Sequence, residues 1–197
     1  MNFLAHLFLS GKNNQLRIGN FIGDWVKGRK YNDYPPDIRN GIILHRKIDS
    51  YTDAHHLTRR CTKLFRPKYK KYSGVVVDIV FDYFLTQNWT KYSDISLADF
   101  AESCYTVLSN EKKQLPEYVQ KILPNLISSN RLVKYSTLTG LKESLETMSL
   151  YTSLPNYAEF AIGTIQENHE EINQNFILFF NELISFVERQ EEYILSR

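Results

Sequence analysis

The sequence predicts an all-α fold, a single-domain helical bundle that spans residues 1–197. Apolar residues recur at helical spacing between breaks marked by proline, most clearly in the C-terminal segment. A chain of 197 residues has the size of one domain, and it contains no linker and no internal repeat of fixed period. With 43% hydrophobic and 23% charged residues, its composition indicates an ordinary globular protein rather than a disordered or collagen-like chain.

Helices are expected one after another along the chain. Residues 36–64 open with Pro-Pro-Asp, a typical helix start, and lack glycine after Gly41, while residues 97–108 and 131–148 also have a helical pattern. Breaks are expected at Pro35, Pro36, Pro67, Pro116, Pro124 and Pro155. A long amphipathic C-terminal helix is predicted by the apolar stripe of Ile172, Phe176, Phe179, Phe180, Leu183, Ile184 and Val187.

The segment GVVVDIVFDYFL, residues 74–85, places Asp78 and Asp82 in an otherwise apolar run. Its valines favour a strand, but no hairpin signal flanks the run, which continues to Trp89 at a length typical of a helix. On a helix the two carboxylates, four residues apart, share one face. A buried ionised carboxylate requires a cation, a proton or hydrogen-bond donors. The pair is therefore either a metal site or a structural pair satisfied by N–H groups or arginine.

A second group of polar residues repeats this spacing at His45, Asp49 and Asp53, which places an imidazole and two carboxylates on one helix face. Asp24 and His6 also interrupt apolar or glycine-rich segments. Imidazole and carboxylate are ligands suited to Mn²⁺, Fe²⁺, Mg²⁺ or Zn²⁺. A single histidine on an apolar face is more often a satisfied core residue than a ligand. Several such residues within the first 82 nevertheless favour a divalent metal site.

Basic residues are concentrated in the first half of the chain. Residues 1–100 carry a net charge of +7, and residues 101–197 a net charge of −5. The densest basic run, residues 59–71, contains no acid and is either a solvated helix face or a surface for an anionic partner. Lys27, Arg29 and Arg46 lie near the acids in sequence and could hold phosphate oxygens. A metal with flanking arginines is typical of phosphoester hydrolysis, in which the metal lowers the pKa of a bound water and polarises the phosphoryl group.

Other features limit the location of the protein and its partners. The N-terminal apolar stretch lacks a basic leader and a cleavage site, and no apolar run has membrane-spanning length. The two cysteines, Cys61 and Cys104, form no CxxC pair and suit a reducing compartment. We therefore expect a cytoplasmic protein with no membrane partner. Nucleic acid is not expected either, because the basic run is short and the second half of the chain is acidic.

Four segments, MNFLAHLFLS, GNFIGDWVKGR, PPDIRNGIILHRKIDSYTDAHH and YSGVVVDIVFDYFLTQNW, together resemble the acyl carrier protein phosphodiesterase family. They span roughly the first 90 residues in the order and spacing of the family. The resemblance implies a variant of the HD-domain metal-dependent phosphohydrolase fold, variant because no histidine of this chain is followed by aspartate. It also implies hydrolysis of the phosphodiester of holo acyl carrier protein, giving apo carrier and free 4′-phosphopantetheine. Manganese is the implied metal, with magnesium and iron as alternatives.

The resemblance assigns roles to individual residues. The expected catalytic residues are Asp24 in GDWVKGR, His45 and Asp49 in HRKID, and Asp78 and Asp82 in DIVFDYFL. The expected metal ligands are Asp24, His45 and Asp78, then His6, with Asp49 or Asp82 supporting them or activating water. The expected surface for the strongly acidic carrier consists of Arg59, Arg60, Lys63, Arg66, Lys68, Lys70 and Lys71. Two alternatives remain open, an HD-type nucleotide phosphohydrolase and a non-catalytic carrier-binding protein whose acids are structural.

Overall fold

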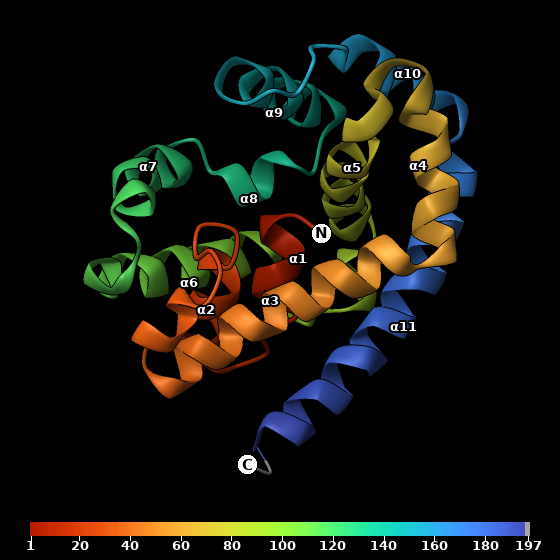
Figure 1. Cartoon of the computed structure of the whole chain (residues 1–197). Coiled ribbons are helices and arrows are strands. Elements are labelled where there is room, and N and C mark those ends of the chain that lie inside the picture. Colours follow the sequence, from red (N-terminus) through yellow and green to blue (C-terminus); the bar gives the residue numbers. More distant parts are fainter. Residues whose placement is uncertain (196–197) are drawn as a thin grey trace.

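A computed structural model describes residues 1–195 and, within this range, consists of helices without a β-strand (Figure 1). The α-helices are α1 (Phe3–Phe8), α2 (Asn14–Ile22), α3 (Pro36–Ala54), α4 (His56–Tyr69), α5 (Ser73–Gln87), α6 (Leu97–Asn110), α7 (Glu117–Ser128), α8 (Arg131–Lys134), α9 (Leu138–Tyr151), α10 (Ala158–Glu167) and α11 (His169–Leu195). The short 3-10 helices are η1 (Lys30–Asp33), η2 (Lys70–Tyr72), η3 (Trp89–Lys91) and η4 (Lys112–Gln114). The predicted all-α class is confirmed, and the buried side chains form one continuous hydrophobic core.

The segment 74–85 is helical, as predicted, and forms most of α5. This helix contacts α1, α4, α9 and α11, so most of its side chains are buried on all sides. Burial against four neighbouring helices outweighs the strand preference of its valines, because a helix surrounded by protein needs no polar face. The helices predicted at 97–108 and at the C-terminus are also confirmed, as α6 and α11. The predicted stripe of α11 is buried, except that Ile184 is only partly so.

Two predicted helices are divided in the structure. The helix expected over 36–64 ends at Ala54, because His55 adopts an extended conformation (φ −70°, ψ 133°) and its side chain accepts a hydrogen bond from the Leu57 N–H. His55 thus caps α4 and turns the chain. The helix expected over 131–148 is interrupted at residues 135–137, where the Thr137 hydroxyl caps α9 by accepting from the Gly140 N–H. Both interruptions are made by side-chain caps rather than by proline or glycine.

Two of the prolines expected to break helices lie inside them. Pro67 lies in the last turn of α4, and Pro124 lies within α7. Proline removes one backbone hydrogen bond and crowds the preceding turn, so it destabilises a helix without necessarily ending it. In α4 the buried side chains of Phe65 and Tyr69, one turn apart, flank Pro67 and hold the last turn against the core.

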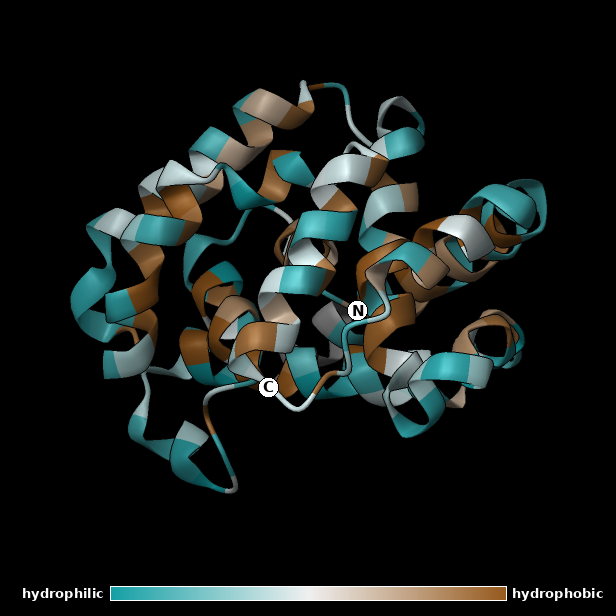
Figure 2. Ribbon diagram, turned by 90° about the horizontal axis from the view of Figure 1, so that it is seen from above, coloured by the Kyte–Doolittle hydropathy of each residue, from teal (hydrophilic) through white to brown (hydrophobic). Residues whose placement is uncertain are grey.

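The longer helices enclose the N-terminal part of the chain. In Figure 1, α3 crosses the molecule and leads into α4, which runs beside α5, and the long α11 passes along both α3 and α4. The chain begins near the centre, where α1 lies between α2 and α5. Seen from above, in Figure 2, hydrophobic segments line the faces between helices, and hydrophilic segments lie on the outer faces. The interior carboxylates and histidines are therefore brought together around α1.

The helices α2 and α3 pack more extensively on each other than any other pair, and glycine makes this possible. A Cβ atom on Gly19 would lie 2.0 Å from the Ile38 carbonyl oxygen. A Cβ atom on Gly41 would lie 2.1 Å from the Leu16 carbonyl oxygen. Only glycine permits this backbone approach. The close pairing fixes the relative position of the polar residues that the two helices carry.

Candidate metal centre

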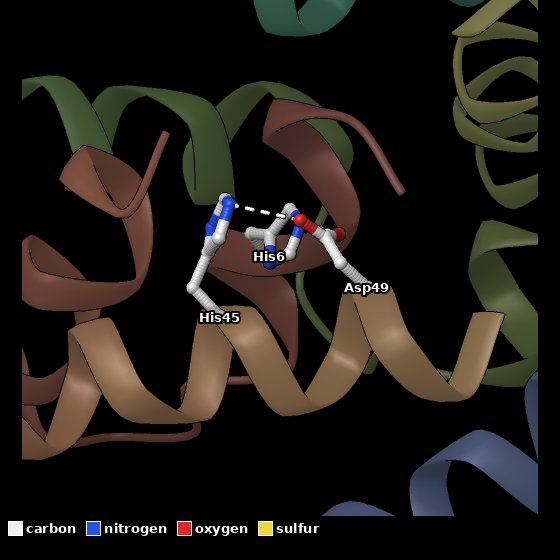
Figure 3. A group of neighbouring side chains, drawn as sticks. All are labelled: His6, His45 and Asp49. Atoms are coloured by element: carbon white, nitrogen blue, oxygen red, sulfur yellow. Dashed lines mark hydrogen bonds and ion pairs between the residues drawn. The ribbon is translucent and has the colours of Figure 1, made fainter. Parts of the chain in front are cut away.

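Three predicted site residues meet in a compact group, namely His6 of α1 and His45 and Asp49 of α3 (Figure 3). One potential ligand atom from each lies within 4.8 Å of the others. Both histidines are buried, and the Asp49 side chain is 37% exposed. The imidazole rings stack with their centroids 3.9 Å apart, beside Gly23, where a Cβ atom would lie 2.2 Å from the His45 ring. Two imidazoles and one carboxylate form a donor set that divalent first-row metals accept.

Asn20 of α2 fixes which nitrogen of each imidazole carries the proton. The backbone carbonyl of Asn20 can only accept, so His45 Nδ1 donates to it at 2.7 Å. The side-chain amide donates through Nδ2 to the His6 carbonyl and to Ser10 Oγ, at 2.7 and 2.9 Å. Its Oδ1 is therefore the acceptor for His6 Nδ1, at 2.8 Å. In their neutral forms both histidines consequently present a bare Nε2 to Asp49.

The contacts of Asp49 call for a positive charge between these groups. Its carboxylate oxygens lie 3.1 Å from His6 Nε2 and 3.1 Å from His45 Nε2. A nitrogen lone pair and a carboxylate repel each other at this distance unless a proton or a cation lies between them. His45 Nε2 is buried and, despite its short distance to Asp49, makes no correctly directed hydrogen bond within the described structure. This buried nitrogen, aimed at carboxylates, fits a metal ligand.

The pKa values follow from the same crowding. Burial lowers the pKa of His6 to about 4, and the neighbouring His45 adds to the effect. Burial also disfavours the charged form of His45, but the nearby carboxylates of Asp24 and Asp49 outweigh it and raise the pKa of His45 to about 9. Burial acts against ionisation of Asp49, yet the two imidazoles prevail and hold its pKa well below the ordinary range. Without a metal, a proton on His45 thus offsets part of the negative charge of Asp24 and Asp49.

Asp24 lies at the solvent side of this group. It follows α2 in the chain, its side chain is 63% exposed, and its Oδ1 lies 3.5 Å from His45 Nε2. The His45 imidazole lowers the pKa of the Asp24 carboxyl. Asp24 therefore offers a second carboxylate to His45, from the side open to solvent.

Asp78 lies outside the compact group. Its Oδ1 contacts the N-terminal ammonium of Met1 at 3.0 Å, and the same ammonium lies 3.3 Å from Asp49 Oδ1. Burial disfavours the ammonium form, but Asp78 and Asp49 raise its pKa to about 11. Sequence reasoning ranked Asp78 ahead of Asp49 among the ligands, whereas the structure places Asp49 between the histidines.

Asp82 is fully buried and caps α1. Its two carboxylate oxygens accept hydrogen bonds from the backbone N–H groups of Leu4 and Ala5, at 2.9 and 3.2 Å. These N–H groups belong to the first turn of α1, which has no partner for them within the helix. Burial raises the pKa of Asp82 to about 7, although the two N–H groups oppose the shift. The sequence left open whether Asp82 is a metal ligand or a structural residue satisfied by N–H groups, and its contacts match the structural role. Asp82 thereby holds α1, the helix that carries His6.

Comparison with known proteins agrees with these motifs. The family profile described as acyl carrier protein phosphodiesterase matches residues 1–183. The chain belongs to the acyl carrier protein phosphodiesterase family. It is 29% identical over 188 residues to the acyl carrier protein phosphodiesterase of Yersinia enterocolitica, covering 94% of this chain and 96% of that protein. It is 28% identical over 198 residues to the protein of the same name from Photorhabdus laumondii, covering both chains fully. No solved structure matches the chain.

In this member of the family, the expected phosphate-binding residues occupy different environments. Lys27 and Arg29 are exposed and follow Asp24 in the same loop. Arg46 is partly buried; its Nη2 donates to the Val26 carbonyl at 2.7 Å, and its guanidinium lies over the Tyr31 ring. Arg46 therefore holds the loop that carries the other two cations.

The basic run predicted as one docking surface of the family enzyme is divided between helix faces. Arg59, Lys63 and Arg66 share one face of α4 and line a pocket. Arg60 projects elsewhere and binds Glu171 of α11, with 2.7 Å between Nε and Oε1. Lys68, Lys70 and Lys71 are exposed at the end of α4 and in η2. Helical rotation, rather than sequence proximity, decides which of these cations act together.

Sequence reasoning missed two participants of the site in this family member, Asn20 and the Met1 ammonium. Asn20 gives a weak signal, because it is a polar residue between Gly19 and Phe21 in the motif that contains Asp24. Its full burial and its contacts with both histidines become visible only in the tertiary structure. The ammonium gives no signal in the sequence. No helix within residues 1–195 is long and apolar enough to cross a membrane.

Proposed function

We propose that this chain hydrolyses the phosphodiester that joins 4′-phosphopantetheine to the serine of holo acyl carrier protein, releasing apo carrier and free phosphopantetheine. We also propose that His6, His45 and Asp49 hold a divalent metal, manganese in the first place, with Asp24 completing the ligand set. Family membership over almost the whole chain supports the reaction. The observation that carries the metal site is the buried His45 Nε2, which faces carboxylates without a directed hydrogen bond.

A divalent metal bound at this centre would lower the pKa of a water molecule and polarise the phosphoryl group. The chain supplies the remaining functions. Asp24, whose side chain is 63% exposed, would hold the metal from the side that is open to solvent. Lys27 and Arg29, exposed on the same loop, are placed to offset charge that develops on the phosphoryl oxygens.

The site supports a variant of the HD-type arrangement. In the HD-type arrangement and in this site alike, the metal ligands come from separate helices of an all-α domain. Here His6 belongs to α1 and His45 to α3. In place of an adjacent His-Asp pair, this chain has His45 and Asp49 one helical turn apart on the same face. The second carboxylate would be Asp24, whose position after α2 brings it to the same histidine.

The charge distribution supports an acidic protein as substrate. The α4 face formed by Arg59, Lys63 and Arg66 is exposed, and such a face would steer an acidic carrier toward the centre. A cytoplasmic setting is consistent with two free and buried cysteines, Cys61 and Cys104.

The proposal is tested with metal-stripped protein, holo acyl carrier protein and added Mn²⁺. A gel mobility shift should show conversion of holo to apo carrier only with the metal, and mass spectrometry should detect phosphopantetheine. Asp49→Asn should lower the turnover at least a hundredfold, because it removes a ligand charge. Asp94→Asn, at an exposed position outside the site, is the matched control. Turnover by metal-free protein, or equal activity of the two variants, would contradict the proposal.

A further inference from the structure

A pocket of about 290 Å³ lies between α4 and α5, close to the proposed metal centre. We call it the α4–α5 pocket; its lining includes Thr58, Thr62, Lys63, Gly74 and Asp78. Asp78 connects it to the centre, because the Met1 ammonium lies 3.0 Å from Asp78 and 3.3 Å from Asp49. The pocket therefore lies beside the proposed metal centre, from which the Asp78–Met1 contact separates it.

The size and the lining of the pocket suit a small flexible chain. A volume of about 290 Å³ is at the lower end of small-molecule sites and is far too small for a folded partner. Most of the lining surface is carbon, with the hydroxyls of Thr58 and Thr62 among it. Thr62 donates to the Thr58 carbonyl, whereas the buried Thr58 hydroxyl oxygen has no hydrogen-bond partner in the described structure. It is one of six buried side-chain polar atoms without a partner in the described structure, and a ligand group that reached it would supply a hydrogen bond.

The α4 side of the pocket is positively charged, whereas two acids, Asp53 and Asp78, also line the pocket. Arg59, Lys63 and Arg66 line it and lie on one face of α4, and none of them forms an ion pair within the described part of the chain. Arg60, on a different face, is paired with Glu171. The unpaired cations that line the pocket thus form a surface where an acidic protein could rest while a chain attached to it enters.

Gly74 keeps the pocket open. A Cβ atom built on Gly74 meets no other atom within 4 Å, although the residue lies in the first turn of α5 and lines the pocket. Its backbone is helical, so its φ angle does not require glycine. A Cβ atom at this position would therefore enter open space at the pocket, and a longer side chain attached to it would fill that space.

We propose that the α4–α5 pocket binds the pantetheine arm of the substrate. The phosphodiester then lies beyond Asp78 at the metal centre, and the carrier rests on the cations of the α4 side. The methyl and methylene groups of the arm match the carbon lining, and its hydroxyl and amide groups give the Thr58 hydroxyl a partner. This inference rests on the proposed function, since it assigns a place to one part of that substrate.

The test uses the Mn²⁺-loaded full chain and two substitutions of the same type. Gly74→Leu fills the pocket, and Gly163→Leu is the matched control, because a Cβ atom on Gly163 of α10 also meets nothing within 4 Å. Binding of free pantetheine is measured by calorimetry, and the KM for holo carrier by the mobility shift. Gly74→Leu should weaken pantetheine binding and raise the KM at least tenfold, while Gly163→Leu should change neither. Thr58→Val, which removes the hydroxyl at constant volume, should weaken pantetheine binding severalfold.

The outcomes separate the two proposals. The Mn²⁺-dependent rise in Tm, equal in all variants, verifies that the fold and the metal centre are intact. If wild type releases phosphopantetheine but does not bind pantetheine, or if Gly74→Leu binds it as wild type does, the pocket assignment is wrong and the proposed function stands. If pantetheine binds and Gly74→Leu abolishes binding, but holo carrier is never cleaved, the proposed function fails and the pocket assignment stands. Binding of AMP in place of pantetheine overturns the pocket assignment.

Discussion

Replacing Asn20 by alanine should destabilise the protein and should also weaken metal binding, by an effect on His6 that is separate from the loss of stability. The Asn20 side chain makes three hydrogen bonds, to His6 Nδ1, to the His6 carbonyl and to Ser10 Oγ, at 2.7–2.9 Å. At about 1 kcal/mol each, their loss should lower the free energy of unfolding by about 3 kcal/mol. In the variant His6 can transfer its proton from Nδ1 to Nε2, where it would donate to Asp49. The lone pair needed for a metal is then lost from Nε2.

Groups that orient a metal-binding histidine typically change metal affinity about 10–100-fold, and we expect Asn20→Ala to fall in this range. The His45 contact is unaffected, because it uses the backbone carbonyl of Asn20. Mn²⁺ affinity is measured by calorimetry, and the tautomer of His6 by ¹⁵N NMR of the metal-free protein. In wild type the proton should be found on Nδ1, and in the variant on Nε2.

Asn88→Ala provides a control for the loss of a buried asparagine. The Asn88 side chain also makes three hydrogen bonds, donating to the Phe84 carbonyl and to Asn173 and accepting from Lys91. Asn88→Ala should therefore destabilise the protein about as much as Asn20→Ala and leave the Mn²⁺ affinity unchanged. If the two variants bind Mn²⁺ equally well, or if His6 in wild type carries its proton on Nε2, Asn20 does not act through the tautomer.

Three further predictions follow from the same contacts. His45, with a pKa of about 9, is protonated in the metal-free protein at pH 7, so Mn²⁺ must displace that proton. The association constant of Mn²⁺ should therefore rise about tenfold per pH unit up to about pH 9. An association constant that calorimetry finds independent of pH would contradict this. Gly19→Ala should lower the free energy of unfolding by about 2 kcal/mol or more, while Gly163→Ala should raise it by about 0.5–1 kcal/mol, both measured by urea denaturation. Lys63→Glu should raise the KM for holo carrier severalfold and reduce the salt dependence of that KM. Arg60→Glu should have a smaller effect, because Arg60 is paired with Glu171 of α11. Equal effects of the two variants would refute the division of the basic run.

The local pattern of the sequence was sufficient for the fold class and for three of the helices, while two other predicted helices are each divided in the structure. Helical periodicity depends on neighbours three and four residues away, so α6, α11 and the apolar α5 could be predicted from it. The breaks were less predictable. His55 and Thr137 end or begin helices through side-chain caps, whereas Pro67 lies inside a helix that buried neighbours hold together.

The sequence by itself determined which residue types are available for chemistry and which of them share a helix face. His45 and Asp49 could be paired in advance because they are one turn apart on one helix. Only the tertiary structure decided that His6, expected as a further ligand, lies beside this pair, that Asp82 caps α1, and that Asp78 contacts the N-terminal ammonium instead. The reason is that these contacts join different helices, whose spacing depends on backbone approaches such as that between Gly19 and Gly41. A short-range pattern does not contain such distances.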